Sequence, residues 1–231
     1  FETLLYQDTL HEALKNSLIV AISSCTLATI LGTLASRSAT RYDFKGKQIS
    51  LTFILAPLIL PEIIVGVSLL IVLIQLGLSL NIWSVILGHT LLIMPFSIII
   101  MNSAFNNLDV SLEEASMDLG ENRFGTFYRV ILPLVFPGII ASLLIGFTLS
   151  LDEFIIAFFL TGTDTTLPVY IWSQFRFPKK LPTTMALGTI LIFVSLILLS
   201  ISEYYRRRTY SKDFVLSTEK EPTKPIKINK D

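Results

Sequence analysis

Five apolar stretches dominate this chain, and each is long enough to cross a lipid bilayer. A membrane-spanning helix needs about 20 mostly apolar residues. Of the 231 residues, 52% are hydrophobic, which is more than a soluble domain of this length requires. The stretches cover residues 14–35, 49–76, 82–104, 134–160 and 185–204. The sequence therefore predicts an all-α membrane protein, built as a polytopic bundle of helices.

Two of these stretches are unusually long and contain residues that interrupt helices. These residues are Pro57, Pro61 and Gly66 in the second stretch and Pro137, Gly138 and Gly146 in the fourth. Backbone groups that are freed at a break must find partners in protein or water, because lipid offers none. We therefore expect both stretches to be interrupted and to face the helix bundle or a cavity.

Lysine and arginine residues predict the orientation of the stretches, because cytoplasmic loops carry an excess of both. Fourteen of the eighteen lie in the loop after the first stretch, the loop after the third stretch and the C-terminal region. These three regions can share one side of the membrane, which is then the cytoplasmic side. Residues 105–130 are accordingly expected to form a cytoplasmic loop, and residues 206–231 a cytoplasmic, disordered tail.

With this orientation the N-terminal end falls on the outer side. The chain begins with Phe1, and no secretory signal precedes the first apolar stretch. Because an N-terminus without a signal crosses a membrane with difficulty, we expect a further helix upstream of this sequence. Residues 1–13 would then form an extracytoplasmic segment after that helix, and residues 14–205 the transmembrane domain.

The loop 105–130 is polar, charged and acidic on balance. Ser111 and Glu114 have the spacing of a capping box, which predicts the start of a short helix. Gly120 is predicted to end this helix in a left-handed conformation. The apolar and aromatic residues of the loop suit a groove on another protein. A helix lying on lipid is the alternative, but such helices are usually basic.

The spacing of this loop is similar to that of a known motif. Gly120 follows Glu114-Ala115-Ser116 after three residues, and Leu132-Pro133 closes the segment. The pattern resembles the EAA loop of bacterial ABC-importer permeases and departs from it by small changes at Ser116 and Val130. Further segments occur in the order found in the spermidine/putrescine importer permeases, among them 60–66, 147–153, 161–162 and 167–168.

The resemblance implies a helix bundle of the type I ABC-importer permease kind. Permeases of this family have six transmembrane helices, so five are expected in this sequence and a sixth before it. The residues that would couple the bundle to an ATPase are Glu114, Ala115, Ser116, Gly120, Leu132 and Pro133. Closure of the ATPase dimer would pull on this loop, and rigid helices would convert the pull into opening of a transport path.

The same resemblance implies a set of partners at the bacterial inner (cytoplasmic) membrane. They are a homologous second permease, a dimer of ATPase subunits, an extracytoplasmic substrate-binding protein and the membrane lipid. The chain contains no phosphate-binding P-loop, so ATP-Mg is expected in the ATPase and not here. We expect a transport subunit that is not itself an enzyme, with no cofactor, no metal site and no nucleic-acid partner.

Three carboxylates, Glu62, Asp152 and Glu153, lie within apolar stretches. Each costs about 2.5–3.5 kcal/mol at the centre of a spanning helix, so each needs a reason to be there. A cationic substrate would supply one, with Phe154 and Tyr170 as aromatic faces along its path. The alternative is a structural role, as a protonated group or in a pair with the second permease. Successive helix residues point in different directions, so at most one of the adjacent pair is expected to face the path.

Several functions compete for this pattern. The leading one is the permease of an ATP-driven importer for polyamines, spermidine or putrescine. Related permeases carry ferric ion, thiamine or phosphonate, but an anion suits three carboxylates poorly. A proton-driven secondary transporter would use His89 and Glu62 as a relay, although it would need no docking loop for an ATPase. A membrane scaffold would not explain the buried carboxylates.

Overall fold

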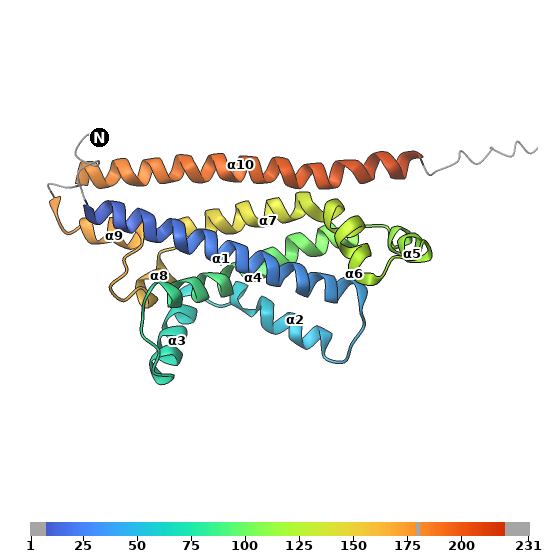
Figure 1. Cartoon of the computed structure of the whole chain (residues 1–231). Coiled ribbons are helices and arrows are strands. Elements are labelled where there is room, and N and C mark those ends of the chain that lie inside the picture. The colour runs from blue at the N-terminus through green and yellow to red at the C-terminus, as the bar shows by residue number, and fades with distance from the viewer. Residues whose placement is uncertain (1–7, 179–180, 220–231) are drawn as a thin grey trace, which may run out of the picture.

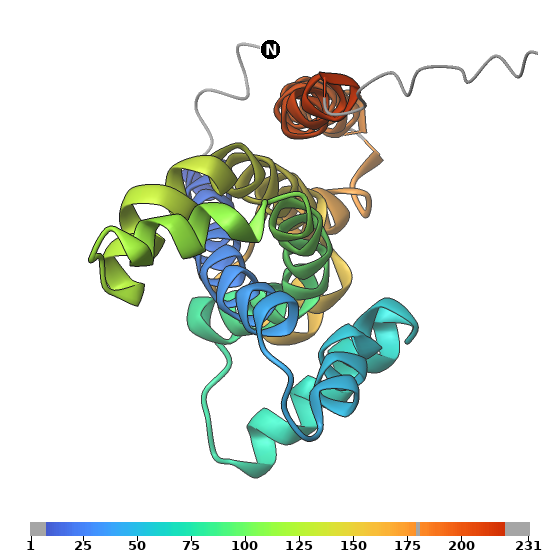
Figure 2. The same cartoon turned by 90° about the vertical axis from the view of Figure 1, so that its right-hand side faces the viewer.

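Three long helices form the centre of the molecule, whose computed structural model describes residues 8–178 and 181–219. They are α1 (Asp8–Arg41), α4 (Ile82–Asn106) and α7 (Leu132–Asp152). They run side by side along the long axis and pack against one another (Figures 1 and 2). A fourth long helix, α10 (Leu181–Glu219), lies outside this group and packs mainly against α7.

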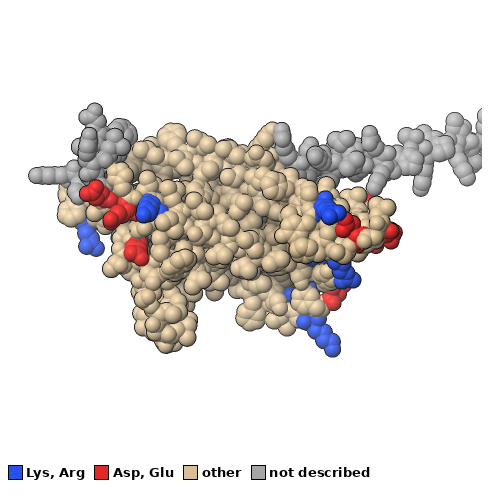
Figure 3. Space-filling model, viewed as in Figure 1, with Lys and Arg blue, Asp and Glu red and all other residues tan. Residues whose placement is uncertain are grey.

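The expectation of five spans is confirmed for the part of the chain that the structure describes. The helical segments Asp8–Arg41, Ile82–Asn106, Arg123–Asp152 and Leu181–Tyr205 are each long and apolar enough to cross a membrane, and a bent pair of helices makes a fifth candidate. Figure 3 shows charged side chains toward the two ends of the long axis and, on this face, a band without charged side chains between them. Which of the two ends faces the cytoplasm stays a prediction.

Glycine lets the three central helices approach closely. A Cβ added at Gly146 of α7 would lie 2.8 Å from Ile93 Cγ2 of α4 and 3.1 Å from Cys25 Cβ of α1. One added at Gly138 would lie 2.9 Å from Ala104 Cβ of α4. Lipid tails are as apolar as the helices, so packing at such small residues drives association in membranes.

Hydroxyl groups join the same three helices across their contact surfaces. Ser142 Oγ donates a hydrogen bond to Ser97 Oγ at 2.8 Å and lies 2.9 Å from Thr29 Oγ1. Nearer one end, Ser36 Oγ donates to the carbonyl of Ile98 at 3.0 Å. An interhelical hydrogen bond in a membrane protein contributes only about 0.6 kcal/mol on average. Close packing therefore holds the helices together, while the hydroxyl pairs fix their register.

The second apolar stretch is bent, as its prolines predict. It consists of α2 (Lys47–Leu55), the 3₁₀ turn η2 (Ala56–Leu58) and α3 (Glu62–Gln75). The second arm is bent by 107° from the direction of the first. Pro61 directly precedes α3 and has no N–H to continue a helix. In Figure 1 the two arms lie beside the central helices instead of running through their centre.

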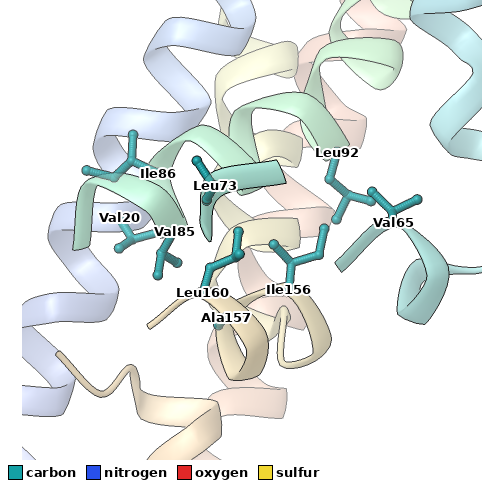
Figure 4. Close-up of a cluster of buried hydrophobic side chains, with 9 residues drawn as sticks. All are labelled: Val20, Val65, Leu73, Val85, Ile86, Leu92, Ile156, Ala157 and Leu160. Atoms are coloured by element: carbon teal, nitrogen blue, oxygen red, sulfur yellow. The ribbon is translucent and has the colours of Figure 1, made fainter. Parts of the chain in front are cut away.

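The short helix α8 (Ile155–Leu160) fills the space between α3 and α4. Gly66 of α3 meets it closely, since an added Cβ would lie 2.9 Å from Phe159 Cδ2. Figure 4 shows the buried apolar side chains that meet here. They are Val20, Val65, Leu73, Val85, Ile86, Leu92, Ile156, Ala157 and Leu160.

The sequence predicts an interruption of the fourth apolar stretch at Pro137, Gly138 and Gly146, but the structure places the break elsewhere. Helix α7 runs through Pro137 without a break, because neighbouring helices in a bundle can satisfy the freed backbone carbonyl. It ends at Asp152, and Glu153 adopts an extended conformation before α8 begins. The predicted span 134–160 is therefore wrong in residues 153–160. At its other end, α6 (Arg123–Thr126) and the π-helical turn η3 (Phe127–Ile131) lead directly into α7.

Helix α10 also extends further than the sequence suggests. Its backbone is helical to Glu219, whereas the sequence predicts a disordered tail over residues 206–231. No glycine or proline occurs between Gly188 and Pro222, so nothing in this interval favours a helix end. Residues 220–231, and residues 1–7 of the predicted N-terminal segment, fall outside the described part of the chain.

A leucine at position 146 is expected to destabilise the central helices. The Gly146→Leu side chain must displace Ile93 and Cys25, and such overpacking costs about 1–3 kcal/mol. The measurement is the temperature at which half of the purified protein aggregates in detergent. Gly188→Leu is the matched control, because nothing lies within 4 Å of a Cβ added there. Equal midpoints for the two variants would contradict this account of the packing.

Candidate functional site

The loop between α4 and α7 contains a short helix, α5 (Val110–Asp118). Its N-cap is Asp109, whose side chain accepts the backbone N–H of Ser111 at 3.0 Å. The predicted capping box of Ser111 with Glu114 is therefore wrong, because the helix begins earlier and an Asp side chain already satisfies its free N–H. Gly120 does end the helix in the left-handed region, with φ of 91°, as predicted.

The six residues predicted to couple to an ATPase occupy different surroundings. Glu114 and Ala115 are exposed on α5, whereas Ser116 is buried and its Oγ lies 3.0 Å from Thr126 Oγ1 of α6. Gly120 forms the turn after α5. Leu132 and Pro133 open α7, where Leu132 is partly buried and Pro133 is exposed. Only the first two therefore present side chains on the outer face of α5.

An apolar surface surrounds the exposed part of α5. Leu119 is 88% exposed and Phe124 is 72% exposed, although both are large apolar side chains. A groove of about 480 Å³ lies alongside, lined by residues that include Tyr42, Glu114, Met117, Arg123 and Phe124. A groove and protruding apolar side chains on one face are typical of a protein-binding surface.

The charged residue that fixes α5 in place is one that the sequence did not single out. Glu113 is only 7% exposed and accepts hydrogen bonds from Arg37 Nη1 at 2.6 Å and Nη2 at 2.7 Å. Arg41 Nε donates to the same carboxylate at 2.9 Å. These donors, Arg37 foremost, hold the pKa of Glu113 below its usual range despite burial. The spacing of Arg37 and Arg41, one helical turn apart at the end of an apolar stretch, was the available signal.

The adjacent carboxylates Asp152 and Glu153 point to different surroundings, at the opposite end of α7 from α5. Glu153 is only 7% exposed, and its oxygens accept the backbone N–H groups of Ile156 at 2.9 Å and Ala157 at 3.1 Å. It thereby caps α8. Its Oε2 also lies 3.2 Å from Nε2 of the buried His89. The divergence agrees with the expectation that the two side chains do not face the same region.

His89 connects this break to the central helices. Its Nδ1 lies 2.7 Å from Ser150 Oγ of α7, and Ser24 Oγ of α1 donates to that hydroxyl at 3.2 Å. The chain of contacts therefore runs from α1 through α7 and α4 to the cap of α8. The relay suggested for a proton-driven transporter paired His89 with Glu62, but in the structure the carboxylate beside His89 is that of Glu153.

Asp152 lies at the surface, at the end of α7, and both of its oxygens accept from Ser195 Oγ of α10 at 2.9 Å. Two residues on, the Phe154 ring lies between those of Phe158 and Trp172, with centroids 5.5 and 5.4 Å away. Trp172 is 53% exposed and was not among the predicted residues. The exposed carboxylate of Asp152 is thus held by α10, and it lies two positions in sequence before the first ring of this aromatic row.

The two remaining candidates have other surroundings. Glu62 is exposed at the first turn of α3, just after the bend. Tyr170, in α9 (Leu167–Gln174), is 7% exposed and packs with Leu10 and Leu167. It also borders a second cavity, of about 810 Å³, together with polar residues such as Lys15 and Asp164.

Residues 28–210 match the family of binding-protein-dependent transport system inner membrane components. The chain belongs to this family. Its membership, together with the apolar helices, places the permease in the inner membrane as a multi-pass protein. Among the side chains that the structure describes, in residues 8–178 and 181–205, there is no group of three metal-ligating residues.

Three curated relatives illustrate the similarity. The permease is 33% identical over 208 residues to the spermidine/putrescine permease PotC of Escherichia coli K12, covering 90% of this chain and 78% of that one. It is 34% identical over 209 residues to PotC of Haemophilus influenzae, covering 90% of this chain and 81% of that one. The putrescine permease PotI of Escherichia coli K12 is 36% identical over 200 residues, covering 82% of this chain and 70% of that one.

Solved structures agree on the fold. The permease resembles a bacterial ABC transporter for the import of alginate with a TM-score of 0.69 at 18% identity, covering 90% of this chain and 82% of that one. It resembles the MetNI methionine ABC transporter with a TM-score of 0.66 at 14% identity, covering 87% and 94%. The predicted type I importer permease architecture is confirmed, since both are ABC transporters of different cargo that share this helix arrangement.

Removal of the Glu153 carboxylate is expected to destabilise the permease. In Glu153→Ala the N–H groups of Ile156 and Ala157 lose their acceptor, and each unsatisfied buried group costs about 1–3 kcal/mol. The half-aggregation temperature in detergent should fall. Glu62→Ala serves as the control, because the Glu62 side chain is exposed. A fall of the same size in both variants would show that Glu153 has no special capping role.

Proposed function

We propose that this permease is the membrane subunit of an ATP-driven importer for polyamines. The observation that carries the proposal is an exposed carboxylate, Asp152, two positions before Phe154, whose ring packs with those of Phe158 and Trp172. A polyamine offers ammonium groups that pair with carboxylates and methylene chains that pack on aromatic rings. The names of the relatives PotC and PotI, which include spermidine and putrescine, support the same class of cargo.

The energy for transport would come from a separate ATPase dimer that binds the exposed face of α5. ATP-Mg would be held by that dimer, and this chain would contribute no cofactor and no catalysis. Glu114 and Ala115 would contact the ATPase directly, with Leu119 and Phe124 as apolar anchors. Ser116, Gly120, Leu132 and Pro133 would shape the loop from within.

Two further partners complete the proposed importer. A homologous permease would pair with this one, so that the path runs between two bundles that are surrounded by lipid. An extracytoplasmic binding protein would deliver the solute, by analogy with the alginate ABC transporter, one structure of which is in complex with a substrate-bound periplasmic protein. The α9 end of this chain would face that protein, and the α5 end would face the cytoplasm.

The substrate path would place the candidate residues in different roles. Asp152, Phe154 and Trp172 would contact the cation directly, since Asp152 and Trp172 are exposed and the Phe154 ring packs against that of Trp172. Glu62, exposed after the bend of α3, would meet the cation at another point of the path. Tyr170 would border its outer entrance. Glu153 would act indirectly, by stabilising the break between α7 and α8.

Polyamine uptake in proteoliposomes tests the proposed path. Asp152→Asn removes the charge, and a hydrogen bond to a charged group contributes about 1.5–3 kcal/mol, so we expect the apparent affinity for spermidine to weaken about tenfold or more. Trp172→Leu is expected to weaken it in the same direction. Asp43→Asn is the control, because this exposed residue pairs only locally with Lys47. Unchanged affinity and rate in both path variants would rule the path out.

The same assay addresses the choice of solute. The family also includes a relative named as a probable molybdenum permease, from Haloferax volcanii, at 31% identity over 196 residues. Spermidine and putrescine are expected to compete for uptake, whereas thiamine, ferric ion and oxyanions are not. Competition by an oxyanion and none by putrescine would contradict a polyamine importer while leaving the ABC permease role intact.

Charge reversal on α5 tests the docking role. Glu114→Lys places a cation on the exposed face of α5, where we expect an ATPase to bind. The variant should fold but lose the ATPase during affinity purification of the transporter. Asp8→Lys, at the other end of the molecule in the first turn of α1, should retain it. Retention of the ATPase by Glu114→Lys, together with normal uptake, would contradict the docking proposal.

A further inference from the structure

The attachment of α5 to the membrane helices has an unusual form. Short turns join it to the chain at both ends, through residues 107–109 on one side and Gly120 on the other. Its contacts with α6 and η3 are local in the sequence. The link to α1, by contrast, joins residues more than seventy positions apart and is made by charged side chains.

Arg37, Arg41 and Glu113 form this link, which we call the Arg–Glu113 clamp. Arg37 reaches both carboxylate oxygens with its two terminal nitrogens, at 2.6 and 2.7 Å. Such a bidentate pair fixes direction as well as distance, because two parallel hydrogen bonds prevent rotation about either one. Arg41 Nε adds a third donor to Oε1 at 2.9 Å.

The clamp also holds the end of α4. Arg41 Nη2 donates to the carbonyl of Leu108 at 3.0 Å and to that of Phe105 at 3.3 Å. Phe105 lies in the last turn of α4 and Leu108 just beyond it, where helix carbonyls lack partners within the helix and attract cations. One arginine therefore joins α1, α4 and α5 through backbone and side-chain acceptors at once.

Aromatic rings complete the surroundings of the clamp. The Arg37 guanidinium carbon lies 5.9 Å from the centroid of the Phe105 ring and 6.0 Å from that of Phe127. Phe127 begins the π-helical turn η3 that leads into α7. The side chain of Arg37 thus reaches from α1 to the end of α4, to the turn that leads into α7, and to α5.

We propose that the Arg–Glu113 clamp is a positioning device that makes α5 move together with α1, α4 and α7. A push or pull on the exposed face of α5 then reaches the central helices directly. Without the clamp, the same displacement would be absorbed by the turns at residues 107–109 and Gly120. The inference rests on the proposed drive by an ATPase bound at α5, and it assigns to Glu113 a role distinct from that of its exposed neighbour Glu114.

Two variants separate the geometry of the clamp from its charge. Arg37→Lys keeps the positive charge but loses the planar fork that contacts both oxygens. Glu113→Gln keeps the shape of the side chain but loses the charge that three donors share. The matched control is Arg129→Lys, because Arg129 makes an exposed ion pair with Glu121 on the same loop.

The first measurement is the amount of spermidine taken up per ATP hydrolysed by the reconstituted transporter. We expect both clamp variants to keep the ATPase bound and hydrolysing, while uptake per ATP falls by about 5-fold or more, within the usual range of coupling between sites. The wild type and Arg129→Lys should share one ratio. An unchanged ratio in the clamp variants would overturn the proposal, and so would loss of the ATPase from both, since the clamp would then serve docking.

The second measurement needs no substrate and therefore separates the clamp from the polyamine proposal. Spin labels at Leu34 of α1 and Asp118 of α5, both exposed, report the distance between the two helices, with Cys25 replaced by Ser. Arg37→Lys is expected to broaden the distance distribution in the assembled transporter. An unchanged distribution would refute the clamp whatever solute the importer carries, whereas failed spermidine uptake by the wild type would count only against the proposed cargo.

Discussion

Close contact between α1, α4 and α7 is the condition on which the rest of the structure depends. Glycines at the contact surfaces allow an approach that no side chain would permit, as at Gly146 between Cys25 and Ile93. Lipid gives helices no hydrophobic reason to associate, so tight packing must supply the attraction. Once the three helices are fixed, a buried carboxylate can be held in a defined place at each end of this group of helices.

The two buried carboxylates solve the same physical problem in different ways. A buried charge must be paired and hydrogen-bonded, or its desolvation outweighs what it contributes. Glu113 meets this requirement with two arginine side chains, and Glu153 meets it with two backbone N–H groups and His89. The first connects a short helix to the bundle, and the second ends α7 so that Asp152 lies at the surface.

The sequence predicts those features that depend on local composition. The apolar stretches, the bend near Pro61 and the left-handed turn at Gly120 are all confirmed, because hydropathy, a missing N–H and a positive φ are properties of single segments. The family is predicted correctly as well, because the spacing of the loop motif is a property of one segment.

The features that the sequence does not predict depend on contacts between distant residues. The apolar stretch continues past Asp152, so hydropathy alone extends the helix, and only the folded position of Glu153 shows why it stops. Glu113 and Glu114 are indistinguishable by composition, and the arginines that select Glu113 lie on another helix. The aromatic row of the proposed substrate path cannot be predicted from residue types either, since Trp172 joins Phe154 only through the fold.

Taken together, these contacts describe a permease in which a short helix and three membrane helices move as one body. Electron cryomicroscopy of the assembled transporter, without nucleotide and with a trapped ATP analogue, tests this most directly. We predict that α1, α4, α5 and α7 superimpose in the two states, with Arg37 still bound to Glu113, while the bundle as a whole changes its position. A rotation of α5 relative to α1 with the pair separated would contradict the account.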